Sequence, residues 1–147
     1  MNSEKSLMDY RNEWKIICDK AFTDYSKLSS VERTWFNVEC LIGAVSKGGI
    51  ISYYYNNDAD YYQETIDDLK KLEQNKIIDL MEKSAKIFPN NAVPKTIDER
   101  NNIISNLPEG KFDNELDKLD EIFLKYENEL EQSLINYLIK YEIIKWN

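Results

Sequence analysis

The residues of this sequence that are best suited to chemistry are carboxylates spaced for one side of a helix. Between Glu109 and Glu131, nine acidic residues stand against three basic ones. Acids three or four positions apart along a helix are separated by about 4.5 to 6 Å along its axis, at 1.5 Å per residue. This separation is similar to the pitch of backbone phosphates, so a protein that holds DNA through Lys and Arg could bind such a row instead.

We therefore predict a partner-binding surface in the C-terminal third of the chain. Its residues are Asp113, Glu115, Asp117, Asp120, Glu121, Glu127 and Glu131. Most of these acids share one helix face by their three- and four-residue spacing. The alternative is a solvated helix face, opposite a core stripe formed by Leu116, Leu119 and Phe123.

A second acidic group surrounds a cluster of tyrosines. The acids are Asp58, Asp60, Glu64, Asp67 and Asp68, and the tyrosines are Tyr53, Tyr54, Tyr55, Tyr61 and Tyr62. A small core cannot bury all of these tyrosines and also pair every hydroxyl, and tyrosine is enriched at protein contacts. From this region we predict five partner-binding residues, namely Asp58, Asp60, Glu64, Tyr54 and Tyr61. Partly exposed core tyrosines are the alternative.

Several kinds of catalysis are excluded by residues that the sequence lacks. It has no His, which removes Ser-His-Asp and Cys-His triads and imidazole ligands for zinc. It also has no glycine-rich phosphate loop. Asn56-x-Asp58-x-Asp60 resembles the start of a calcium loop, but Tyr61 stands where that loop requires Gly. We expect neither an enzyme nor a cofactor or metal site, with a carboxylate-based metal-binding protein as an alternative.

The charge balance points to a basic protein as the partner. There are 27 acidic residues against 19 basic ones, for a net charge of −8. Such a surface repels the phosphates of nucleic acids and membranes, and the scattered Lys and Arg form no stripe for direct nucleic-acid binding. No apolar run approaches the roughly 20 residues of a membrane-spanning helix, and the N-terminus does not resemble a secretion signal. We expect a cytoplasmic location.

The apolar residues recur at helical spacing, which predicts an all-α fold. We expect one compact domain over residues 1–147, a bundle of about six to eight helices, with an N-terminal helix within 1–27 and a core over 28–142. The first helix is expected from Ser6 to Lys20. Ser29-x-x-Glu32 predicts the start of a second helix, which Gly48-Gly49 would end, and Thr96-x-x-Glu99 predicts another start.

Two segments leave alternatives open. Ile50 to Tyr55 has the β-branched and aromatic residues of a strand, but no other segment could pair with it, so we interpret it as helical. The pattern from Leu116 to Tyr141 fits either one long helix or two stacked helices. Cys18 and Cys40 are expected to be free, partly because there is no secretion signal.

The order of motifs resembles the bacterial DNA-mimic protein family. The pattern Glu32-Arg33-x-x-Phe36 leads to the turn Gly48-Gly49-Ile50-x-x-Tyr53, and Phe88-Pro89 and an Asp-Glu-Arg group at 98–100 follow. The resemblance covers roughly residues 28–142. It implies a compact all-helical, non-enzymatic protein whose acidic surface stands in for DNA phosphates. In at least one member the resemblance implies a homodimer that opposes a transcription regulator.

Three functions remain open at this point. The first is a DNA-mimic-like antagonist of a basic DNA-binding protein, such as a regulator. The second is an immunity protein that neutralises a toxin, for example a nuclease, through the same acids and the tyrosine cluster. The third is the carboxylate-based metal-binding protein.

Overall fold

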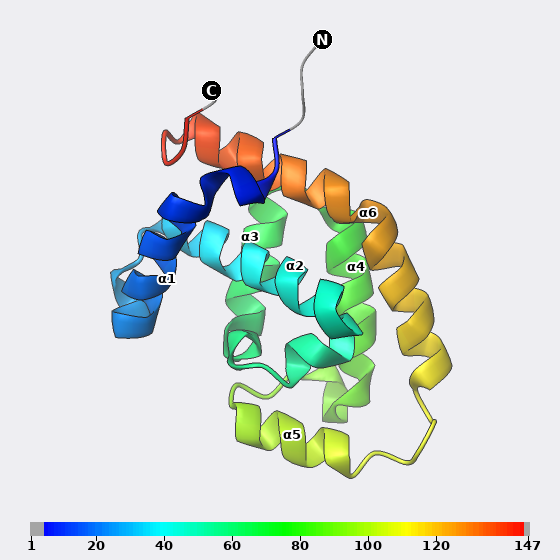
Figure 1. Ribbon diagram of the computed structural model, residues 1–147. Helices are drawn as coiled ribbons and strands as arrows, with labels where there is room; N and C mark the ends of the chain where they lie inside the picture. The colour runs from blue at the N-terminus through cyan, green and yellow to red at the C-terminus, as the bar shows by residue number, and fades with distance from the viewer. Residues whose placement is uncertain (1–4, 146–147) are drawn as a thin grey trace.

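The computed structural model describes residues 5–145, which form helices joined by short turns (Figure 1). Within that range there are six α-helices and no strand, which confirms the predicted all-α fold. The α-helices are α1 (Arg11–Asp24), α2 (Ser30–Tyr54), α3 (Tyr62–Lys71), α4 (Asn75–Ser84), α5 (Ile97–Ser105) and α6 (Asp113–Lys140). Short 3-10 helices are η1 (Leu7–Tyr10), η2 (Tyr25–Lys27), η3 (Asn57–Tyr61), η4 (Ala85–Ile87) and η5 (Pro89–Asn91).

Side-chain caps begin helices where the sequence predicts them. Ser29 and Glu32 form a capping box at the start of α2, in which each side chain accepts a hydrogen bond from the other residue's backbone N–H. Thr96 caps α5 by accepting the N–H of Glu99. Local sequence is sufficient for these starts, because a cap needs only one side-chain oxygen close to a free backbone N–H.

The N-terminal segment differs from the predicted single helix. Ser6 begins the 3-10 helix η1, and the α-helical geometry starts only at Arg11 and continues to Asp24. This segment packs beside the end of the chain, where the Tyr10 hydroxyl donates to the carbonyl of Lys145 at 3.3 Å. This hydrogen bond links the N-terminal segment to a residue 135 positions away in the sequence.

Helix α2 consists of two helical stretches joined by a kink at its glycine pair. Gly48 and Gly49 leave the helical region of backbone space, and Gly49 has a φ of 80°, a conformation that favours glycine. Ile50 to Tyr54 is helical beyond the bend, which confirms the interpretation of that segment as helix. The glycine pair thus ends the first helical stretch, as predicted, and a second stretch begins directly after it.

The core lies between α2 and the helices that surround it. Trp35, Leu41 and Tyr53 of α2 have no exposed surface. Helix α6 is one continuous helix of 28 residues that packs against α2 and α4, and it forms a long curved edge of the molecule (Figure 1). The single long helix is therefore the correct alternative for the C-terminal third. None of the helices within residues 5–145 is both long and apolar enough to cross a bilayer.

Helix α1 packs on α2 through aromatic rings. The Trp14 ring lies 5.7 Å from that of Trp35 and 5.9 Å from that of Phe36, between centroids. Cys18 and Cys40 lie partly buried beside this contact and are both free, as predicted. Burial raises the pKa of both thiols above the ordinary value, which disfavours their thiolate forms.

Candidate acidic interaction surface

Helix α6 turns one side to the core and leaves its acids outside. Leu119, Phe123, Leu130 and Leu134 are buried and recur at intervals of four and seven positions. Because a helix repeats about every 3.6 residues, the positions between them point away from the core. The acids of α6 lie outside this stripe; those with exposed side chains are Asp113, Glu115, Asp117, Glu121 and Glu129, whereas Asp120, Glu127 and Glu131 are partly buried.

Five acids repeat along the side of α6 that is next to α2. We call this set the α6 acidic row, and it consists of Asp113, Asp117, Asp120, Glu127 and Glu131. At 1.5 Å per residue, the row extends about 27 Å along the helix. One DNA strand carries a phosphate every 3.4 Å or so, which is about eight over that length. The row alone is therefore less dense in charge than a DNA strand.

The acids of α6 differ in how far they are already engaged within the molecule. Asp113, Asp117 and Glu121 are exposed. Glu115 is also exposed and forms an ion pair with Lys86 at 3.0 Å. An exposed ion pair of this kind contributes little to stability, so a stronger cation could replace it.

Two acids of the row support the bend of α2. The Asp120 carboxylate accepts the N–H of Ile50 at 2.8 Å, which satisfies a backbone donor just after the glycine pair. Burial raises the pKa of Asp120 above its ordinary value, and the charge of Asp117 acts in the same direction. The Ser46 hydroxyl donates a hydrogen bond to Glu127. Asp120 and Glu127 therefore belong to the row and also hold α6 against α2 on either side of the glycine pair.

The two acidic groups predicted from the sequence meet in space. Glu131 from the α6 acidic row and Asp58 from the second group line one hollow of about 430 Å³ on the surface. Glu39 of α2 lines the same hollow, and so do the basic residues Arg11 and Lys47. Negative surface therefore continues from α6 toward η3, although it is interrupted by these two cations.

Glu39 was missed by the sequence analysis. Its carboxylate accepts the indole N–H of Trp35 at 3.0 Å, and burial raises its pKa from 4.5 to about 7. The charge of Glu131 acts in the same direction, while the Trp35 hydrogen bond and Arg11 oppose the change. The sequence did contain a signal for this buried acid: Glu39 stands four residues after Trp35, within an apolar stripe of a predicted helix.

The second acidic group belongs largely to the scaffold. Asp60 forms an ion pair of 2.7 Å with Arg100, whose guanidinium is completely buried. Arg100 also donates to the backbone carbonyls of Tyr54, Asn56 and Pro94, each at 2.9 Å. One arginine thus holds the segment that follows α2 against the start of α5. The Asp60 side chain keeps about a third of its surface exposed, at 36%.

The expectation for Tyr54 was wrong. Its side chain is completely buried, with its hydroxyl 2.6 Å from that of Ser84 and its ring against Phe88. The tertiary fold supplies a hydroxyl partner for this tyrosine, which makes burial favourable. Tyr61 is half-buried and stacks on Tyr25 with 3.6 Å between ring centroids. Glu64 is also half-buried, so the predicted anchors of this region offer only part of their surface.

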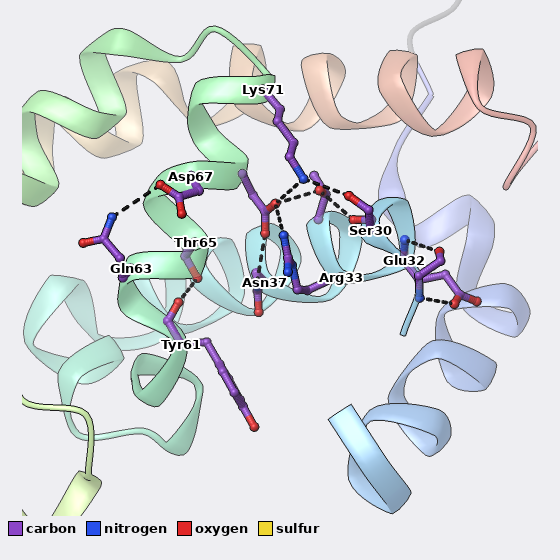
Figure 2. Close-up of polar contacts among 12 residues, drawn as sticks. Ser30, Glu32, Arg33, Asn37, Tyr61, Gln63, Thr65, Asp67 and Lys71 are labelled. Atoms are coloured by element: carbon purple, nitrogen blue, oxygen red, sulfur yellow. Dashed lines mark hydrogen bonds and ion pairs between the residues drawn. The ribbon is translucent and has the colours of Figure 1, made fainter. Parts of the chain in front are cut away.

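Asp68, which the sequence placed in the second acidic group, is completely buried between α2 and α3. Its carboxylate accepts hydrogen bonds from Thr34 at 2.8 Å and from Asn37 at 2.9 Å. Lys71 lies 3.3 Å and Arg33 3.8 Å from the same carboxylate. Figure 2 shows the side chains of Arg33, Asn37 and Lys71 converging between the two helices. We call Arg33, Thr34, Asn37, Asp68 and Lys71 the Asp68 cluster, and it joins α2 to α3.

The residues of the calcium-like motif have other tasks in the fold. The Asn56 side chain caps η3 by accepting the N–H of Asp58, and Asp60 pairs with Arg100. Among residues 5–145 there is no group of three or more His, Cys, Asp or Glu side chains arranged to hold a metal ion.

Fold and surface together define an all-α, single-domain protein with a net charge of −8. Residues 26–141 match the family model described as DMP19-like protein, and the chain therefore belongs to the DMP19-like family. The matched region begins after α1 and includes α2 to α6. Comparison with curated proteins found no match, and comparison with solved structures found none either.

Proposed function

We propose that this protein is a non-enzymatic DNA mimic that binds a basic DNA-binding protein through the α6 acidic row and the acids near it. The observation that carries the proposal is the row itself, in which carboxylates repeat over about 27 Å of helix. Lys118 and Lys125 fall on another side of α6 by the helix period, so no α6 cation interrupts the row. Membership in the DMP19-like family is compatible with this role.

The α6 acidic row has fewer charges than a DNA strand of the same length, so the row alone would not reproduce the charge that a DNA-binding protein meets. A DNA strand has about eight phosphates over the length in which the row has five carboxylates. Exposed Glu109 and Glu121 add charge beside the row. We therefore expect the partner to engage the row together with this surrounding surface.

The immunity-protein alternative receives less support from the structure. It relied on the tyrosine cluster as a set of interface anchors in addition to the acids. Tyr53 and Tyr54 are completely buried, and Tyr61 is stacked on Tyr25. Of the cluster, Tyr55 is exposed and Tyr62 is half-buried, so fewer tyrosines are accessible than that alternative expected, and its acids are shared with the DNA-mimic proposal.

The test is capture of a partner from lysate of the native host on immobilised protein at low salt, followed by competition with double-stranded DNA. We expect a basic DNA-binding protein that DNA displaces, because both ligands would use the same cationic surface. Raising the salt from low to physiological levels should weaken the binding by about tenfold or more. Capture of no basic protein at low salt, or of one that DNA does not displace, would overturn the proposal.

A matched pair of variants separates a specific surface from net charge. The triple variant Asp113→Asn, Asp117→Asn, Glu121→Gln neutralises exposed acids of α6. The control triple Glu73→Gln, Glu82→Gln, Glu99→Gln neutralises the same number of exposed acids elsewhere. We expect only the α6 triple to abolish capture.

A further inference from the structure

A hollow of about 370 Å³ lies where the bend of α2 meets the segment that leads into α6. Its apolar lining includes Ile51, Ile104, Leu116 and Phe112, which come from α2, α5, α6 and the α5–α6 connection. Ile104 is nearly completely buried and the other three are half-buried. The hollow therefore offers an apolar floor on a surface that is otherwise strongly charged.

Four carboxylates and no cation border this apolar floor. The acids are Glu109, Asp113, Asp117 and Asp120. The hollow at Glu131 differs, because Arg11 and Lys47 line it, and a further hollow beside α5 is lined by Lys86 and Lys111. Of these three hollows in the described part of the chain, the one at the α2 bend is the hollow whose charged lining is entirely acidic.

The backbone of α2 shapes this hollow. Gly48 lies in its lining, and the adjacent Gly49 leaves so little room that a Cβ there would stand 2.5 Å from the Asp120 carboxylate. Asp120 is in turn tied to the N–H of Ile50. Asp113 and Asp117 stand one helical turn apart, about 6 Å along α6, and are exposed at the rim. They can approach one cationic group from two sides.

We propose that this hollow receives a single Arg or Lys side chain of the basic protein partner and anchors it on α6. The methylene stem of such a side chain packs on apolar surface while its charged head stays among polar groups. The hollow offers both, because its floor is apolar and its rim is acidic. Charge-assisted hydrogen bonds to carboxylates are among the strongest available, and Arg is enriched among the residues that dominate binding energy. This inference rests on the proposed function, because it names a contact within that binding surface.

The experiment uses glycine-flanked peptides with one central residue, either Arg, Lys or the neutral Arg isostere citrulline. They are titrated into the full-length protein labelled at Ile and Leu methyl groups, with NMR shifts as the readout. We expect the Arg and Lys peptides to shift the methyls of Ile51, Ile104 and Leu116 in a saturable way. The citrulline peptide should bind about tenfold more weakly or worse, because it lacks the charge.

Two double variants with the same change in charge test the assignment to this hollow. Asp113→Asn with Asp117→Asn should weaken the Arg peptide by about tenfold or more. Glu82→Gln with Glu129→Gln removes two exposed acids outside the hollow and should leave the affinity within about twofold. Circular dichroism checks that both variants keep the fold.

Any of three results would overturn the anchor: no saturable shift of those methyls, equal binding of the citrulline peptide, or equal losses in the two double variants. The outcome is separate from that of the proposed function. If the peptides bind as expected but no DNA-binding protein is captured from the host, the hollow stands and the mimic role fails. If a DNA-binding protein is captured but the peptides do not bind, the mimic role stands and the assignment of this hollow as an anchor fails.

Discussion

Acidic residues have opposite roles in two regions of this molecule. In the Asp68 cluster, a carboxylate with no exposed surface accepts two side-chain hydrogen bonds and lies within 4 Å of two cations. In the α6 acidic row, Asp113 and Asp117 are exposed at the rim of a hollow that no cation lines. The first arrangement uses its charge within the fold, whereas the second leaves charge available to a partner.

The difference teaches that the neighbours of an acid, and not its place in an acidic stretch, decide its role. Removing a carboxylate from water is costly unless donors and cations replace the lost solvation. The Asp68 cluster supplies both from α2 and α3, while the row remains in contact with water. Four predictions test how sharp this division is, in order of decreasing effect on stability.

The largest effect is expected at the centre of the Asp68 cluster. Asp68→Ala removes the acceptor of Thr34 and Asn37 and leaves Arg33 with reduced compensation in a partly buried place. We expect a loss of about 3 to 5 kcal/mol in the free energy of unfolding, measured by urea denaturation. The neighbouring exposed acid provides the control, since Asp67→Asn should change stability by less than about 0.5 kcal/mol. Equal effects of the two variants would contradict the division.

The second prediction concerns the place where the row joins the scaffold. Gly49→Ala puts a Cβ 2.5 Å from Asp120 and requires a φ of 80° from an L-residue. We expect a loss of about 1 to 3 kcal/mol in thermal or urea unfolding. Gly43→Ala is the matched control in the same helix, because a Cβ there meets nothing within 4 Å. It should stabilise the protein by about 0.5 to 1 kcal/mol through helix propensity.

The third prediction uses the intermediate case, Glu39. Its pKa is raised from 4.5 to about 7 in the folded protein, so in this window the folded chain holds a proton that the unfolded chain has lost. The contribution of Glu39 to stability therefore falls as the pH rises from about 4.5 to 7 and stays lost above it.

The variant Glu39→Gln isolates this contribution from those of the other acids. It should show a weaker decline of unfolding free energy between pH 5 and pH 8, by on the order of 1 kcal/mol, and should be the more stable protein at pH 8. Urea denaturation at several pH values measures the difference. Parallel pH profiles for the two proteins would show that Glu39 does not hold its proton in the fold.

The smallest effect on stability is expected in the α6 acidic row. Asp117→Asn should change the free energy of unfolding by no more than about 0.5 kcal/mol, because the side chain is exposed. Thermal unfolding measures this change. A loss of 2 kcal/mol or more would mean that Asp117 belongs to the scaffold, as Asp68 does, and would remove the contrast between the two regions.

Much of the fold follows from local patterns, and much of the surface does not. The capping box at Ser29 and the cap at Thr96 involve residues three positions apart, so the sequence predicts them directly. The partners of Asp68 lie 34 and 31 positions away, in Thr34 and Asn37, and the ring and hydroxyl of Tyr54 find theirs at Phe88 and Ser84. No local pattern reports such distances, which is why Tyr54 was wrongly expected at an interface.

The sequence by itself determined the helical fold, the absence of imidazole chemistry and the concentration of acids on the C-terminal helix. These follow from residue types and from the helix period, which act over one or two turns. Only the tertiary structure decided which carboxylates are neutralised, because that depends on which donors and cations other helices bring within hydrogen-bonding distance. The tertiary structure pairs Arg100 with Asp60, buries Asp68 between α2 and α3, and leaves Asp113 and Asp117 exposed to solvent.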